Sequence, residues 1–431
     1  MNTTMLIVCL IALILIVLIS VKFKVNIGIV AYAMAFLVGG FGLGIPARAI
    51  VTYFPVDLFF QLFAVTLFYG FSVANGTMQK IADFAVYWGR NKPALLPWII
   101  FIVSFVICAI GCPPPGIGAA LVALSVAIQK RTNMNYYLAV SIGTFGGMAG
   151  GFMPLGLFTT ITKGLIIKVG GVEPVLAAGY VNKISLFMII FEVLCAVAIY
   201  IWGKGYKTNK LEMDKPEPFN KKQKQTLAII AGVLILIIVP AVLKLFIPFF
   251  KTFTNYISIL SLACIGAILC SILKVADERQ VIRNNIPWPL LVTIIGAVTF
   301  FGVVNEAGFT EFISGLFSPS MTGMIAALMF CFLAGALSFF VDSTGVVLPL
   351  FIPVAVQVAK GSPLVVLYMA ALCMGAYAAG NCPISTGGAI MMSQVDDERR
   401  EKLFFTAWIA AFATLGIALI VTLVGGLFPW T

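Results

Sequence analysis

Apolar runs of about 20 residues recur along the whole chain, and they constrain its fold more than any other feature. A bilayer core of roughly 30 Å is crossed by about 20 helical residues, because each residue adds 1.5 Å. Eight uninterrupted runs approach or exceed this length: 5–21, 25–45, 57–75, 178–202, 226–248, 255–273, 286–306 and 404–428. Since backbone groups in lipid must find their hydrogen bonds within the protein, these runs predict an all-α polytopic membrane protein.

Composition supports the membrane class and argues against several functions. Apolar residues make up 61% of the 431-residue chain and charged residues 10%, which is the balance of a membrane protein. The sequence has no histidine, the usual general base and the commonest metal ligand. Its nine cysteines lie in apolar runs without metal or redox spacing. Lys and Arg form no continuous basic face, so nucleic-acid binding is not expected.

Two further apolar segments, 95–129 and 322–359, are interrupted near the middle and predict hairpins. After the first interruption the returning arm runs from Gly118 to Gln129, about 18 Å of helix, which is too short to cross. Each segment should therefore enter and leave the membrane on one face. Two long segments also carry Gly/Pro breaks, 136–168 and 363–393. Altogether we predict about ten transmembrane crossings plus two re-entrant hairpins.

These interruptions are spaced alike in the two halves of the chain. Gly116 precedes Pro154 by 38 residues, and Gly345 precedes Pro383 by 38 residues, with an offset of 229. Upstream, glycines and an isoleucine recur between 70–81 and 302–313 at an offset of 232. We call residues 112–116 and 342–345 the first and second tip, and residues 150–156 and 380–388 the first and second break. Paired breaks of this kind point to the binding site of a secondary transporter.

The distribution of basic residues orients this plan in the membrane. With both termini outside a cell (inner) membrane, the cytoplasmic gaps hold 20 of the 27 Lys and Arg residues, as the positive-inside rule expects. The crossing 57–75 then runs inward and 286–306 runs outward, so the repeats are inverted and allow alternating access. The predicted domains are N-terminal helices, first inverted repeat, cytoplasmic linker, connecting helices and second inverted repeat: 1–56, 57–202, 203–225, 226–285 and 286–428.

The second half carries the more polar candidate site. Hard oxygen ligands at its tip and break suit a small cation such as Na+, and the candidate ligands are Asp342, Ser343, Thr344 and Asn381. Substrate-binding candidates are Ser343, Thr344, Pro383, Ser385 and Thr386. A carboxylate within the membrane is costly, so Asp342 is a functional candidate; alternatively it caps the returning arm at the outer aqueous face.

The first half supplies fewer polar side chains. Its tip is Cys112-Pro113-Pro114-Pro115-Gly116, which leaves backbone groups to bind a ligand. Substrate-binding candidates there are Gly116, Gly118, Pro154, Thr159, Thr160 and Lys163. Lys163 either compensates a substrate carboxylate or extends outward to the interface. Glycines 143, 147 and 151 either belong to the site or form a close helix-packing face. Glu192 and Glu306 are expected to face the bundle or the interface without a functional role.

At these residues the chain resembles the MatC-type dicarboxylate carriers, a branch of the ion transporter superfamily that includes divalent anion/sodium symporters. The run from Gly116 to Ala127 followed by 147–156 resembles the first half of that family, and 343–349 followed by 383–389 resembles the second. The resemblance implies uptake of malonate or C4 acids by an elevator movement, usually in a homodimer. In sodium-coupled relatives each tip carries Ser-Asn-Thr; the matching positions here are Asp342-Ser343-Thr344 and Pro114-Pro115-Gly116.

These observations predict a secondary active transporter of a small organic anion, driven by Na+ or H+, without another cofactor. A cation/proton antiporter of the same superfamily is the alternative, since Lys163 is the one clear basic candidate near the predicted site. An intramembrane enzyme would need an activated nucleophile or a pair of carboxylates, and Asp342 has no obvious acidic partner in the spans. The chain is therefore not expected to be an enzyme.

Overall fold

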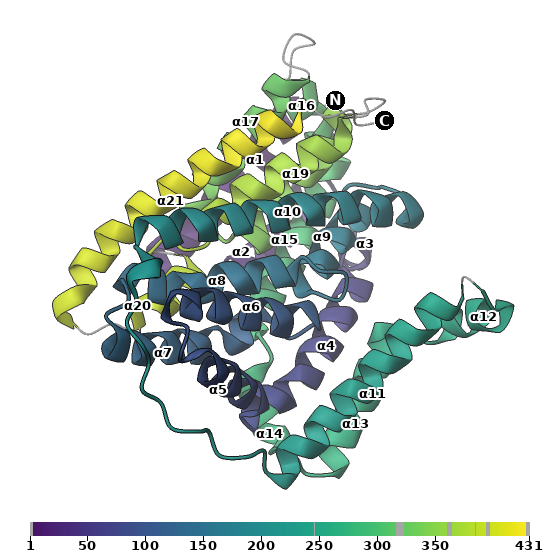
Figure 1. The fold of residues 1–431 in the computed structure, drawn as a ribbon. Helices are drawn as coiled ribbons and strands as arrows, with labels where there is room; N and C mark the ends of the chain where they lie inside the picture. The colour runs from purple at the N-terminus through teal and green to yellow at the C-terminus, as the bar shows by residue number, and fades with distance from the viewer. Residues whose placement is uncertain are drawn as a thin grey trace.

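The computed structural model describes residues 3–244, 246–315, 323–359, 364–383, 385–393 and 397–427. Throughout these ranges the chain forms helices joined by turns and has no strand, which confirms the predicted all-α class (Figure 1). Five of the described helices are long and apolar enough to cross a membrane: α4 (Val56–Ala74), α10 (Pro174–Trp202), α11 (Lys221–Leu243), α15 (Trp288–Glu306) and α21 (Asp397–Gly425).

The order of elements in the first half recurs in the second. The first series follows α4 and ends at α10: α5 (Thr77–Gly89), α6 (Leu96–Ala109), α7 (Pro114–Thr132), α8 (Tyr136–Gly151) and α9 (Leu157–Lys168). The second follows α15 and ends at α21: α16 (Phe309–Gly315), α17 (Met324–Ser338), η6 (Ser343–Val347) with α18 (Leu348–Val358), α19 (Val365–Ala378) and α20 (Thr386–Ser393). Gly76 and Gly308 have φ of +74° and +79° at matching turns, a conformation that glycine adopts without strain. Helices end or begin at each predicted tip and break, although α7 begins at Pro114 and η6 at Ser343, within the predicted tips, and α20 begins at Thr386, within the predicted second break.

The correspondence begins earlier than the predicted repeat boundaries. Helix α2 (Ile27–Phe36) and helix α13 (Ile259–Ile272) start 232 residues apart, and each is capped by a side chain, from Asn26 and Ser258 respectively. Each packs on a helix of the other half: α2 lies against α15, and α13 lies against α4. A Cβ added at Gly296 would lie 1.9 Å from the carbonyl oxygen of Gly28, so α2 and α15 touch through their backbones. The two halves are therefore interlaced.

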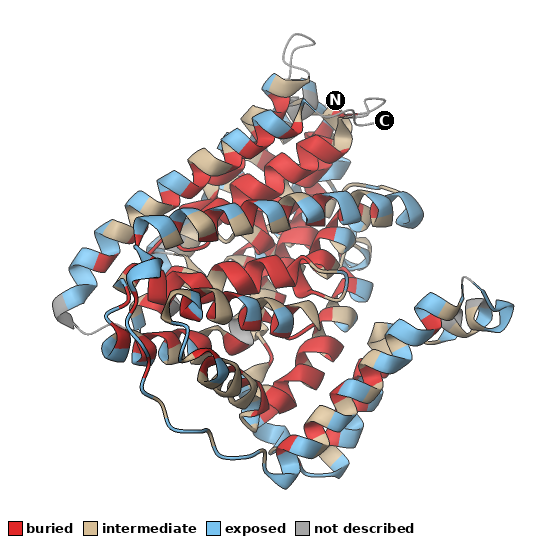
Figure 2. Ribbon diagram, viewed as in Figure 1, coloured by how far each residue is buried: buried red, intermediate tan, exposed pale blue. Residues whose placement is uncertain are grey.

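The centre of the molecule is built on α8 and α19, which are buried on nearly every face (Figure 2). Apolar residues on all sides are expected of a helix surrounded by other helices. Helix α6 packs on α8 and α17 packs on α19. Added Cβ atoms at Gly146 and Gly150 would lie 2.2 Å from the carbonyl oxygens of Phe101 and Phe105, and at Gly375 the distance to the Cys331 oxygen would be 2.0 Å. These small residues let the helices approach closely.

Helices α11, α12 (Pro248–Tyr256) and α13 form an arm that stands away from the central helices (Figure 1). Its exposed side chains are largely apolar, including Ile235, Ile238, Val242, Ile265 and Ile268, which suits a face toward lipid. The predicted span 255–273 is shorter in the structure, because Ser258 caps α13 and fixes its start at Ile259.

The chain between the halves has no α-helix from Gly203 to Asn220, where it forms η3 (Gly205–Lys207) and extended backbone. This segment lies within the predicted linker 203–225, and a capping box between Asn220 and Gln223 starts α11 at Lys221. The remaining elements are α1 (Thr3–Phe23), η1 (Leu37–Gly42), α3 (Ala47–Thr52), η2 (Pro93–Leu95), α14 (Glu278–Gln280) and η4 (Val281–Asn285).

Candidate functional site

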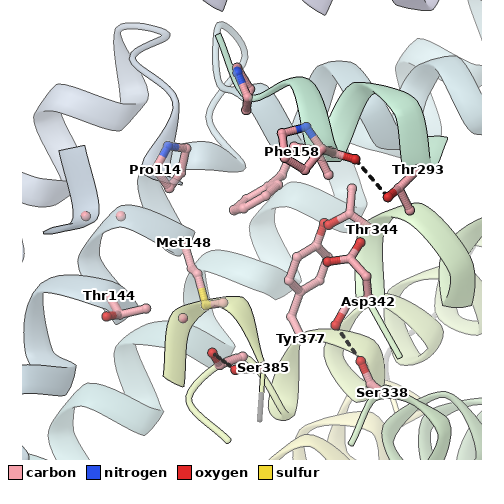
Figure 3. Close-up of a pocket in the computed structure, with 18 of the residues that line it drawn as sticks. Pro114, Thr144, Met148, Phe158, Thr293, Ser338, Asp342, Thr344, Tyr377 and Ser385 are labelled. Carbon is pink, nitrogen blue, oxygen red and sulfur yellow. Dashed lines mark hydrogen bonds between the residues drawn. The ribbon is translucent and has the colours of Figure 1, made fainter. Parts of the chain in front are cut away.

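Both tips and the second break meet at one central cavity of about 510 Å³, which also reaches α8 and α9 near the first break. Pro114 and Met148 lie on one side of it, and Asp342, Thr344 and Tyr377 lie on the other (Figure 3). The lining residues belong to α6, α7, α8, α9, α15, α19 and the segments around them. Regions that are distant in sequence thus form one concave site of the size expected for a small ligand.

The second tip supplies the charged group of the cavity. Asp342 accepts a hydrogen bond from the backbone N–H of Gly345 at 2.6 Å, and so caps the helix that returns from the tip. It also lines the cavity. The capping role and the exposure to a ligand, which were alternatives in the sequence, therefore occur together. Among the described lining residues Asp342 is the one carboxylate, and none is Lys or Arg.

The hydroxyls of the second tip connect it to α19. Ser343 donates to the carbonyl oxygen of Ala376 at 2.7 Å and is hydrogen bonded to Ser338. Thr344 and the Tyr377 hydroxyl lie 3.0 Å apart. Because Ala376 and Tyr377 sit in the last turn of α19 and Ser338 ends α17, the second tip is held against the ends of both helices.

The second break is organised by Ser385. Its hydroxyl bonds to the carbonyl oxygens of Gly380 and Cys382, both at 2.7 Å, and accepts from the N–H of Gly388 at 3.1 Å. Ser385 lines the cavity, whereas Asn381 is buried outside the lining set. Neither the oxygen nor the nitrogen of the Asn381 amide has a hydrogen-bond partner among the described residues. Buried amides normally have partners, so this side chain is available to a ligand that reaches it.

The first tip forms an apolar wall. Cys112 is buried, and Pro114, Ile117, Gly118 and Leu121 line the cavity from the start of α7. Pro114 and Pro115 lack the N–H groups that a helix start otherwise offers, so this tip presents few donors. The glycines of α8 divide into two rows. Positions 143 and 147 line the cavity, whereas 146 and 150 pack on α6.

Several predicted site residues lie away from the cavity. Lys163 is exposed on α9, which agrees with the alternative that its side chain extends outward to the interface. Thr159 is buried, with its hydroxyl 3.5 Å from that of Ser185. The residues placed outside the lining set are Pro154, Thr159, Thr160, Lys163, Pro383 and Asn381. Gly116 lies in the first turn of α7, and Thr386 starts α20; the side-chain environment of both positions lies outside the described residues.

Other lining residues carried no signal in the sequence. Asn26 accepts from Gly28 N–H at 2.8 Å and from the Thr293 hydroxyl at 3.2 Å, so α2 and α15 present a polar corner to the cavity. Tyr377 and Phe158 pack with ring centroids 5.0 Å apart. The offset of 232 that relates Asn26 to Ser258 is the one sequence regularity that could have drawn attention to this corner.

A central cavity lined by both tips and the second break, in a chain with five helices able to cross a membrane among the described residues, defines a membrane transporter. Residues 1–151 match the family model of the dicarboxylate carrier protein MatC N-terminus, and residues 252–430 match the citrate transporter family model. Both ends of the chain thus match carrier families. The resemblance to MatC-type carriers is confirmed, and the chain is a transporter of organic anions and not an enzyme.

The fold is similar to that of the YdaH transporter of Alcanivorax borkumensis, whose crystal structure is described as revealing an unusual topology. The TM-score is 0.53 at 12% sequence identity, and the likeness covers 96% of this chain and 99% of that one. At this identity the likeness concerns the fold alone. No curated protein sequence matches the chain.

Proposed function

We propose that the protein carries a small dicarboxylate, such as malonate or a C4 acid, by Na+- or H+-coupled, elevator-type alternating access. The observation that carries the proposal is the convergence of both tips and the second break on one cavity. The second tip is bonded to the last turn of α19, which leads into the second break, and this suits a part that moves as a unit.

The charge of the cavity supports cation coupling. A dicarboxylate brings two negative charges to a lining that has Asp342 and no described Lys or Arg. A cation bound at Asp342 would compensate both the carboxylate and the substrate, so that neither ligand binds well alone. Ser343 and Thr344 of the lining are further oxygen ligands for Na+, as is the unpartnered Asn381 amide for an ion that reaches it, and Ser385 lines the cavity beside them.

A cation/proton antiporter is the second candidate, favoured by the same acidic lining. Uptake of labelled malonate and succinate into proteoliposomes, with Na+ and pH gradients imposed separately, distinguishes the two. Accumulation driven by either gradient supports the dicarboxylate proposal. Cation exchange without carboxylate accumulation would instead identify the antiporter. Lys163→Gln is a control that should retain wild-type uptake, because its side chain lies outside the lining set.

We further propose an inner-membrane homodimer with both termini outside. The excess of Lys and Arg in the gaps 203–225 and 274–285 supports this orientation. Labelling of single cysteines introduced at the termini and at Lys210, in sealed right-side-out vesicles, tests the orientation, and mass measurement of the detergent-solubilised protein tests the dimer. Labelling at Lys210 and protection of the termini would contradict the orientation.

A further inference from the structure

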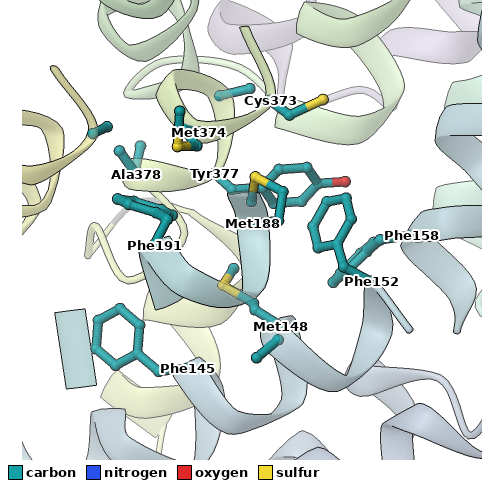
Figure 4. Packing of buried hydrophobic residues seen from close by; sticks show 14 of the residues in the cluster. Phe145, Met148, Phe152, Phe158, Met188, Phe191, Cys373, Met374, Tyr377 and Ala378 are labelled. Atoms are coloured by element: carbon teal, nitrogen blue, oxygen red, sulfur yellow. The ribbon is translucent and has the colours of Figure 1, made fainter. Parts of the chain in front are cut away.

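A carboxyl group that the proposed site does not use lies in the most buried part of the molecule. Glu192, on α10, is 0% exposed, and both carboxyl oxygens lack a hydrogen-bond partner among the described residues. Apolar packing surrounds this turn of α10, with Met188 and Phe191 lying against residues of α8 and α19 (Figure 4). An unpaired carboxylate is very costly in such surroundings, whereas the neutral acid is tolerated.

Helix α10, which carries Glu192, packs on α8 and α19, and both of these helices line the cavity. On the cavity side, the Tyr377 hydroxyl of α19 lies 3.0 Å from the Thr344 hydroxyl of the second tip. Phe152 and Phe158 pack on the Tyr377 ring at centroid distances of 5.2 and 5.0 Å. Tyr377 thus belongs both to the cavity lining and to the apolar cluster that contains Met188 and Phe191 of α10 (Figure 4).

The other titratable groups near Glu192 are thiols and phenols. The titratable side chains that face this region from the packed elements are Cys195 on α10, Tyr137 on α8, Cys373 and Tyr377 on α19, and Cys382 in the second break. Helix α9 contributes Lys163 and Lys168, which are exposed. The charged residues of α21 are confined to 397–402, at its start. A metal cation would need several oxygen ligands, but a proton needs the carboxyl alone.

We infer that Glu192 is a proton-binding site that couples transport to a pH gradient, in addition to the cation site proposed at Asp342. One proton passes from cavity water to the Glu192 carboxylate, which becomes the neutral acid. This inference deepens the proposed function and rests on it. An anion in the cavity repels an ionised Glu192, so anion binding and protonation favour each other, as symport requires.

Two measurements test the proton site. The infrared carbonyl band of a protonated carboxyl, measured on the purified protein without substrate, should be present in the wild type and absent from Glu192→Gln. In proteoliposomes, the apparent malonate affinity of the wild type should rise about 5- to 150-fold as the pH falls through the titration of that band. Glu192→Gln should bind malonate with little pH dependence and exchange it, but should not accumulate it in response to a pH gradient.

The matched control is Glu306→Gln. Glu306 accepts a hydrogen bond from Tyr53 at 2.8 Å, away from the cavity, and this variant should keep the wild-type band and pH response. An unchanged proton-driven accumulation in Glu192→Gln, or a wild type whose Glu192 is ionised at neutral pH, would overturn the inference. If no carboxylate is transported, the proposed function fails, whereas the infrared measurement still reports on Glu192 independently. Exchange activity shows that the Gln variant is folded.

Discussion

The two tips occupy matching positions in the chain but present opposite chemistry to the same cavity. The first tip offers prolines and aliphatic side chains, and the second offers a carboxylate and two hydroxyls that are bonded into α19. Duplication has thus preserved the backbone plan of both halves, while the polar contacts are concentrated in one. The two halves can therefore share one fold while contributing different numbers of polar contacts to the site.

The largest expected effect is that of Asp342→Asn. Because Asp342 is the one carboxylate among the described lining residues, its loss should reduce gradient-driven uptake by about 10- to 100-fold, in the range of typical coupling energies. Uptake into proteoliposomes with Na+ or pH gradients measures it. Asp57→Asn, at the exposed start of α4, is the control. Full uptake with unchanged ion dependence in Asp342→Asn would mean that the second tip is not the coupling site.

Substitutions at the close helix contacts behind the two tips should destabilise both halves to a similar extent, although the tips themselves differ in chemistry. Gly150→Ala and Gly375→Ala each place a methyl group about 2 Å from a backbone oxygen, which should destabilise the fold by about 1–3 kcal/mol. Thermal unfolding in detergent tests both variants. Gly232→Ala, where nothing lies within 4 Å, should not destabilise. If just one of the two central glycines mattered, the halves would differ in packing as well as in chemistry.

Thr344→Val should weaken substrate binding moderately. The change removes the hydroxyl that lies 3.0 Å from the Tyr377 hydroxyl, and a typical hydrogen bond contributes about 0.5–1.5 kcal/mol, or about 2- to 12-fold in affinity. Titration calorimetry with malonate measures this loss. Tyr377→Phe and the double variant complete a cycle; additive losses would show that the two hydroxyls act independently.

The smallest effect is expected at the first tip. Pro114→Ala keeps the apolar wall but loosens the chain, so stability should fall by about 0.4–1 kcal/mol while malonate affinity stays the same. Unfolding and binding measurements on one preparation separate these outcomes, with Pro93→Ala at the start of η2 as the control. A large loss of affinity would instead show that the first tip contacts the substrate.

The positions of the tips and breaks could be predicted because Gly and Pro act locally on the backbone. Side-chain directions could not. On α9, apolar residues surround Lys163 and the threonines, so the sequence does not indicate which face the helix buries, and packing on α10 turns Lys163 outward. Asn26 and Thr293 reach the cavity through the interlacing of α2 with α15, a contact between residues 267 positions apart. In the sequence Tyr377 cannot be distinguished from an aromatic residue of the core. Its place in the site follows from the end of α19 lying beside the second tip.

The contact of Gly28 with Gly296 also has a consequence for biogenesis. The chain leaves the ribosome from its N-terminus, and 268 residues separate these two glycines. At roughly 5–20 residues per second, α2 waits about 13–54 s in the membrane before the helix that covers it is synthesised. During that interval the face of α2 that later contacts α15 must meet lipid or the insertion machinery. The packing of α2 on α15 is therefore completed late in synthesis.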